Sequence, residues 1–174
     1  MEFLSTKQNH TPRATTGRKF FEDMVLHPCC YLEVLHICQD LNLNLPKSYV
    51  DFLLDMGHGA GSFLKGSDCF YDDLINIQKW ARALLIENNF PLPLPDKAFV
   101  FLMHQGYQFS FMDLAEGYDP PVYSYCEGQK EQTFIKTADK FGDFLATEIA
   151  FHKSIDSALE HLELSGTRAI ATKT

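Results

Sequence analysis

The spacing of hydrophobic residues changes once along this chain, and the change divides the sequence into two kinds of segment. Between residues 28 and 87, apolar side chains recur every three or four positions, which is the spacing of one face of a helix. From Ala98 onward, AFVFLMH is continuously apolar and YQFSFMD alternates apolar with polar residues, as strands do. The proline-rich PLPLP lies between the two parts. Helices followed by strands predict an α+β fold.

Three helices are expected before the strands and a fourth after them. The clearest begins near Pro46, a residue suited to a first helical turn, and Gly57 predicts a left-handed stop. Its inward face is spaced i, i+3, i+4 and i+7, in the residues Tyr49, Phe52, Leu53 and Met56. The helix near Pro28 carries Tyr31, Val34, Leu35, Cys38 and Leu41 at helical spacing. The last helix has Thr137 as its expected cap.

Four strands are expected between residues 98 and 137, with Gln105-Gly106 as a tight hairpin turn. Short connections of this kind favour one antiparallel meander of about four or more strands, backed by the helices. We therefore expect a single domain over residues 21–164. Residues 1–20 are predicted to be a polar, disordered tail, with a transit peptide as the alternative, and residues 165–174 a C-terminal tail.

The composition is that of a globular, water-soluble domain. Hydrophobic residues make up 45% of the chain, yet the longest unbroken apolar run, Phe99–Met103, is too short to span a membrane. No secretory signal is visible near Met1. Because the five cysteines are odd in number and form no CxxC pair, we expect reduced thiols, a cytoplasmic protein and no structural zinc site.

The charge is unevenly spread. Residues 43–149 carry eight Lys or Arg against fifteen Asp or Glu, a balance of −7. Such an acidic body repels phosphates, which argues against nucleic acid as a partner. It suits a basic protein partner, or it serves solubility alone.

No set of residues predicts a reaction. The histidines fall on different predicted elements with no recognised ligand spacing, and a pairing of Cys126 with His104 is the only conceivable nucleophile arrangement. Two groups of acids, around Asp68 and around Glu116, suit helix capping, a divalent ion or a partner-facing surface. We predict no catalytic residue, no metal site and no cofactor, with an unrecognised hydrolase as the weakest alternative.

Four segments in this order resemble the SUKH superfamily: LPKSYVDFLLDMGHG, FLMHQGYQFSFMDL, DPPVYSY and ADKFGDFLATEI. The resemblance covers roughly residues 28–150. Met56 departs from it, since family members often place Asn before the glycine that ends the first of these helices, and the two tails have no counterpart. Members include the yeast Knr-type cell-wall assembly regulators and many bacterial immunity proteins.

The resemblance implies a single α+β domain that binds protein and is not an enzyme. An immunity protein would bind and block a cognate toxin, commonly a nuclease, and an acidic body would steer toward such a basic partner. The alternative is a Knr-like regulatory or scaffold protein that acts through several protein partners. The oligomeric state stays open.

Within that reading, Asp119-Pro120-Pro121 is expected to stiffen the approach to an edge strand and to present nearby tyrosines at its rim. Protection of the edge against aggregation is the alternative, and Tyr123 and Tyr125 share a face that is either rim or core. The predicted partner-binding residues are Asp68, Asp72, Asp73, Glu116, Tyr118, Asp119, Tyr123 and Tyr125.

Overall fold

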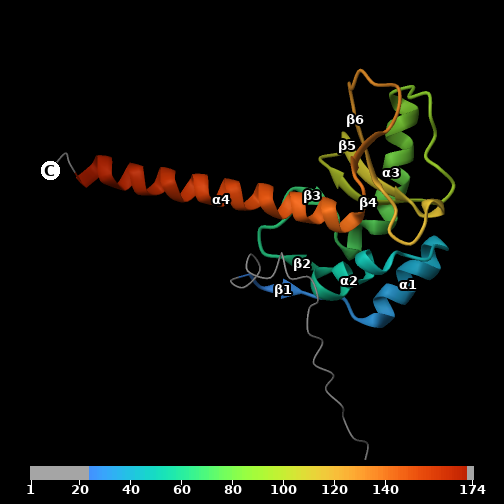
Figure 1. Ribbon diagram of the computed structural model, residues 1–174, viewed down its shortest axis with the longest axis horizontal. Helices are drawn as coiled ribbons and strands as arrows, with labels where there is room; N and C mark the ends of the chain where they lie inside the picture. Colours follow the sequence, from blue (N-terminus) through green and yellow to red (C-terminus); the bar gives the residue numbers. More distant parts are fainter. Residues whose placement is uncertain (1–23, 172–174) are drawn as a thin grey trace, which may run out of the picture.

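The structure is a computed structural model that describes residues 24–171, with side chains described continuously as far as Ile155. Within that range, four helices, a five-stranded antiparallel sheet and a two-stranded sheet form one α+β fold, as predicted (Figure 1). The predicted tail at residues 1–20 lies outside the described residues.

The first half of the chain is mainly helical. Its elements are β1 (Leu26–His27), α1 (Tyr31–Leu41), α2 (Lys47–Met56), β2 (Gly59–Ala60), β3 (Ser67–Asp68), the 3-10 turn η1 (Tyr71–Asp73) and α3 (Leu74–Glu87). β1 and β2 pair with each other, so the helical hairpin of α1 and α2 is closed at its base by a short two-stranded sheet.

The second half supplies most of the main sheet and the last helix. Its elements are β4 (Ala98–His104), β5 (Gln108–Asp113), the 3-10 turn η2 (Leu114–Glu116), β6 (Val122–Cys126), β7 (Ile135–Ala138) and α4 (Phe141–Ala171). The strands lie in the order β3-β4-β5-β6-β7, and every pair is antiparallel. This order confirms the predicted meander.

The hairpin between β4 and β5 turns where the sequence predicts it. Gln105 and Gly106 both have positive φ angles, 47° and 79°, which suit a two-residue turn that follows the twist of the strands. β1, β2 and β3 were not predicted, because a strand of two residues is too short to show an alternating pattern.

An aromatic core joins the helices to the sheet. Tyr49 of α2 is fully buried and lies edge-on to Phe99 of β4 and Phe141 of α4, with ring centroids 4.8 and 5.1 Å away. The predicted inward face of α2 is buried throughout. The buried face of α3 consists of Leu74, Ile77, Ala81, Leu84 and Leu85. These contacts fix where α2 lies against β4, and so they position the loop described below.

Several local predictions are wrong. In α1, Val34 is buried and Cys38 and Leu41 pack against the core, as predicted, but Tyr31 and Leu35 are more than half exposed. Ile37 is buried and was not predicted. Gly57 ends α2 with a right-handed φ of −62°. Thr137 lies in β7 and does not cap α4.

The long helix α4 continues through residues 165–171, which the sequence places in a tail; residues 172–174 lie outside the described part. No proline interrupts this segment, so nothing in its backbone chemistry forces the helix to end earlier.

Candidate functional site

The loop between β5 and β6 is held in shape by its own side chains. The carboxylate of Asp113 accepts a hydrogen bond of 3.0 Å from the backbone N–H of Ala115, which starts η2. The hydroxyl of Tyr123 donates a hydrogen bond of 3.0 Å to Oε2 of Glu116. Gly117, with φ 123°, then turns the chain, a conformation that residues with a side chain rarely adopt.

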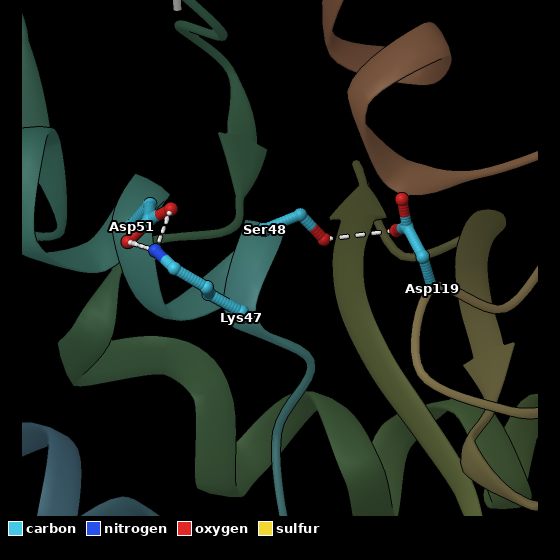
Figure 2. A network of polar contacts seen from close by, with 4 residues as sticks. All are labelled: Lys47, Ser48, Asp51 and Asp119. Carbon is cyan, nitrogen blue, oxygen red and sulfur yellow. Dashed lines mark hydrogen bonds and ion pairs between the residues drawn. The ribbon is translucent and has the colours of Figure 1, made fainter. Parts of the chain in front are cut away.

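The same loop is tied to a helix that is distant in sequence. Oγ of Ser48, in the first turn of α2, donates a hydrogen bond of 3.0 Å to Oδ1 of Asp119 (Figure 2). The neighbouring Lys47 points toward Asp51 in the same view and forms an ion pair with it. Pro120 is buried, so the double proline is anchored in the protein. The loop is braced at both ends.

Between the two braces, one aromatic side chain points into solvent. Tyr118 is 99% exposed, whereas Tyr123 is half-buried. In the sequence, Glu116 lies two positions before Tyr118, and Asp119 follows Tyr118 directly. The loop therefore presents a tyrosine flanked by two carboxylates, in a conformation fixed before any partner arrives.

Two of the predicted tyrosines face the core. The ring of Tyr123 stacks on Phe111 with centroids 5.6 Å apart, and Tyr125, only 2% exposed, packs against Phe109 and Phe90. Tyr125 lies opposite Phe109 in the β5–β6 register, and partners opposite each other share a face of the sheet. Of the two positions that the sequence left open for this face, rim and core, Tyr125 takes the core.

Three other predicted acids lie together elsewhere. Asp68 ends β3, and Asp72 and Asp73 lie in η1. Partial burial raises the pKa of Asp73, and the negative charges of Asp68 and Asp72 raise it further. The three carboxylates are therefore near enough to repel one another.

The sheet keeps these acids apart from the braced loop. Asp68 pairs with Met103 near one end of β4, whereas Asp113, just before the loop, pairs with Ala98 at the other end. Met103 lies five positions after Ala98 along the strand, a distance of about 17 Å. The predicted residues thus form two acidic surfaces rather than one.

The one conceivable nucleophile pair is not formed. Gln108 of β5 lies opposite His104 of β4 on one side and Cys126 of β6 on the other. His104 and Cys126 are therefore two strand spacings apart, roughly 9.6 Å between their backbones. His104 instead shares a hydrogen bond of 2.9 Å with Ser67.

A group of three potential ligands appears that the sequence did not suggest. One ligand atom from each of Cys29, Glu33 and His58 lies within 4.8 Å of the other two. The three residues come from the start of α1 and from the turn after α2, so their spacing along the chain gave no signal. His58 therefore lies beside two other potential ligands, although the histidines show no recognised ligand spacing along the sequence.

This group is poorly suited to nucleophilic catalysis. Burial, and then the charge of Glu33, raises the pKa of the Cys29 thiol to about 12. A reactive cysteine needs the opposite shift, because the thiolate is the attacking species. Glu33 itself is held ionised, since the backbone N–H of Cys30 and the ring of His58 lower its pKa.

Across residues 24–171, none of the helices combines the length and the apolar character needed to cross a lipid bilayer.

Helices backing an antiparallel meander, with exposed acidic loops, define a small α+β domain. The model of the SUKH_6 family, described as SMI1-KNR4 cell-wall, matches residues 36–145 of this chain. The chain therefore belongs to the SUKH family, as the resemblance predicted. No curated protein matches it. Membership of this family supports, in general terms, a protein-binding module of the immunity type or of the Knr-like type.

Proposed function

We propose that this protein is an immunity protein that neutralises a cognate, nuclease-type toxin by direct binding, in the cytoplasm and without catalysis. The observation that carries this proposal is the braced acidic loop, in which Asp119 is tied to Ser48, Glu116 to Tyr123, and Tyr118 stands 99% exposed between them. Family membership supports the broader class of function.

The loop has the properties of an interface anchor. Tyrosine is enriched among the residues that dominate binding energy, because its ring buries a large area and its hydroxyl can still form a hydrogen bond. Association costs less free energy when the contacting segment is already ordered. The two hydrogen bonds and the buried Pro120 provide that order here.

The negative charge of the protein favours a basic partner. The chain carries a formal net charge of −8, and residues 43–149 hold most of the excess acid. A nuclease domain presents basic residues to the phosphates of its substrate, so an acidic inhibitor would be attracted to the same surface. The separate cluster of Asp68, Asp72 and Asp73 offers a second acidic contact.

The test uses the product of the adjacent reading frame, which under this proposal carries the toxin domain. The purified domain is titrated with this protein while nucleic-acid cleavage is followed, and the dissociation constant is measured in parallel. We expect stoichiometric inhibition. Tyr118→Ala should weaken binding by about 30-fold, the effect of a typical interface hot spot.

Tyr107→Ala is the matched control, because Tyr107 is also an exposed tyrosine but lies on the β4–β5 hairpin, away from the braced loop. Its affinity should stay within about twofold of the wild type. Equal effects of the two substitutions would rule out the loop as the anchor, and uninhibited cleavage at saturating protein would rule out neutralisation.

The alternative is a Knr-like regulatory or scaffold protein, and the cell-wall description of the matching family model favours it. A scaffold would leave the toxin active and would instead bind several unrelated protein partners. The same titration therefore separates the two functions.

A further inference from the structure

The strongest unassigned feature of the fold is the group of Cys29, Glu33 and His58. Cys29 lies just before α1, Glu33 in its first turn, and His58 in the turn that follows α2. Their ligand atoms lie within 4.8 Å of one another, although the residues span two helices. The two short strands β1 and β2 run beside them and pair with each other.

Glu33 divides its two carboxylate oxygens between different tasks. Oε2 accepts a hydrogen bond of 2.7 Å from the backbone N–H of Cys30, which fixes the carboxylate in a capping box at the start of α1. Oε1 lies 3.0 Å from Nε2 of His58. One oxygen is thus used to orient the group, and the other faces the histidine.

The backbone of each ligand residue is also fixed. The N–H of Cys29 donates to the carbonyl of Leu53 at 2.9 Å, and the N–H of His58 donates to the carbonyl of His27 at 2.8 Å. Gly57 precedes His58 and leaves room for the Cys29 sulfur, because a Cβ at Gly57 would meet that sulfur and would lie 2.6 Å from the carbonyl oxygen of Leu53. The sulfur is therefore held against the residue next to His58.

We propose that Cys29, Glu33 and His58 bind one divalent, thiophilic cation, of which Zn²⁺ is the best fit. Thiolate, imidazole and carboxylate are its usual ligands, and water takes the fourth position where the protein provides three. On binding, the Cys29 thiol releases its proton to solvent and the sulfur becomes a thiolate ligand. The bound ion links the start of α1 to the turn after α2.

The distances need only small adjustments. The ligand atoms of one tetrahedral Zn²⁺ ion lie about 3.4 to 3.6 Å apart. The ligand atoms of the three residues all lie within 4.8 Å of one another, and those of Glu33 and His58, at 3.0 Å, would move slightly apart. Solvent reaches the group, since the side chains of Glu33 and His58 are 32% and 30% exposed.

The Glu33 carboxylate meets a further requirement of metal sites. Metal ligands are usually held by a second hydrogen bond that orients them, and losing such a bond typically weakens metal affinity by about 10- to 100-fold. The Cys30 N–H supplies this bond to Glu33. An ordinary His–Glu ion pair beside a helix cap is the competing interpretation, and it predicts no metal affinity.

The test is a titration of the full chain, freed of metal by a chelator, with Zn²⁺ alone by calorimetry and with Co²⁺ alone by absorption spectroscopy. We expect one equivalent to bind, with a thiolate-to-cobalt charge-transfer band in the near ultraviolet. Cys29→Ser should abolish that band, and His58→Gln should weaken Zn²⁺ binding by about 10-fold or more.

The chain offers matched controls for both substitutions. Cys126→Ser changes a free cysteine on β6, outside the group, and His36→Gln changes an exposed histidine on α1. Both variants should bind like the wild type. His58 is itself exposed, so His58→Gln tests the site even if Cys29→Ser does not fold. No binding to the wild type, or equal losses in the controls, would overturn the proposal.

Discussion

At the scale of single residues, Tyr49 combines a predicted burial with an unusual polar group. Its side chain is fully buried among the rings of Phe52, Phe99, Phe101 and Phe141. Its hydroxyl has no hydrogen-bond partner among the residues that the structure describes. Burial raises the pKa of Tyr49 well above its usual value, so the hydroxyl stays protonated. The ring stabilises the core while the hydroxyl costs free energy.

Tyr49→Phe should therefore leave the free energy of unfolding unchanged or raise it by up to about 1 kcal/mol, because the ring stays and an unpaired polar atom is removed. Tyr49→Ala should lower it by about 3 to 5 kcal/mol through the cavity left behind. Urea unfolding measures both. A clear loss of stability in Tyr49→Phe would mean that a buried water or another partner binds the hydroxyl.

Tyr118, in the braced loop, is in the opposite environment from the buried Tyr49. Tyr118 and Tyr125 are both tyrosines in the predicted partner-binding set, yet one is 99% and the other 2% exposed. Tyr125 lies in the regular alternation of β6, and Tyr118 follows Gly117 outside any strand. Of these two tyrosines, only Tyr118 remains in the proposed interface.

At the scale of elements, a side chain of α3 completes the backbone hydrogen bonding of β4. β3 pairs with β4 only at Met103 and His104, so the first part of β4 has no strand beside it on that side. The side chain of Gln78 lies at that gap, and its amide nitrogen donates to the carbonyl of Val100 at 2.5 Å. Its amide oxygen accepts from the N–H of Val100 at 2.9 Å. Gln78 thus provides the two hydrogen bonds that a neighbouring strand would.

Gln78→Leu should lower the free energy of unfolding by about 2 to 4 kcal/mol, because it leaves a buried N–H and a buried carbonyl of Val100 unpaired. Gln39→Leu, at an exposed position on α1, is the matched control and should change it by less than about 0.5 kcal/mol. Hydrogen exchange at Val100 provides a local check, since its protection should fall in Gln78→Leu alone. Unchanged stability and protection would show that the amide is not needed.

At the scale of the whole molecule, acid is distributed over two surfaces on one rigid framework. The loop at one end of β4 and the cluster of Asp68, Asp72 and Asp73 at the other are about 17 Å apart along the strand. With a net charge of −8, both contribute to a long-range field that attracts a basic partner. Within the proposed function, the field governs the rate of encounter, whereas Tyr118 governs the lifetime of the complex.

The association rate constant with the basic toxin domain should therefore fall by about 10-fold or more as salt rises from roughly 0.01 to 1 M, with little change in dissociation. A variant carrying Asp68→Asn, Asp72→Asn and Asp73→Asn should lower the association rate and flatten this salt dependence. Tyr118→Ala should instead speed dissociation. Stopped-flow measurements separate the two constants, and an association rate that does not depend on salt would contradict steering.

Much of the fold follows from local patterns, and particular residues show why. The inward face of α2, from Tyr49 to Met56, was predictable from its helical spacing of apolar residues. The strand β4 was predictable from its continuous apolar run, and β5 from its alternation of apolar and polar residues. The exposure of Tyr31 and Leu35 on α1 was not predictable, because both side chains are apolar and yet lie outside the core. Hydrophobicity indicates which side chains gain from burial, but the packing of neighbouring elements decides which of them are buried.

By itself, the sequence determined the α+β class, the meander, the family and the acidic balance, since each depends on the order and composition of residues along the chain. Only the tertiary structure decided that Ser48 binds Asp119, that Gln78 pairs with Val100, and that His58 meets Glu33. These pairs are 71, 22 and 25 positions apart. Contacts at such separations arise when helices and strands pack in three dimensions, and no local periodicity specifies them.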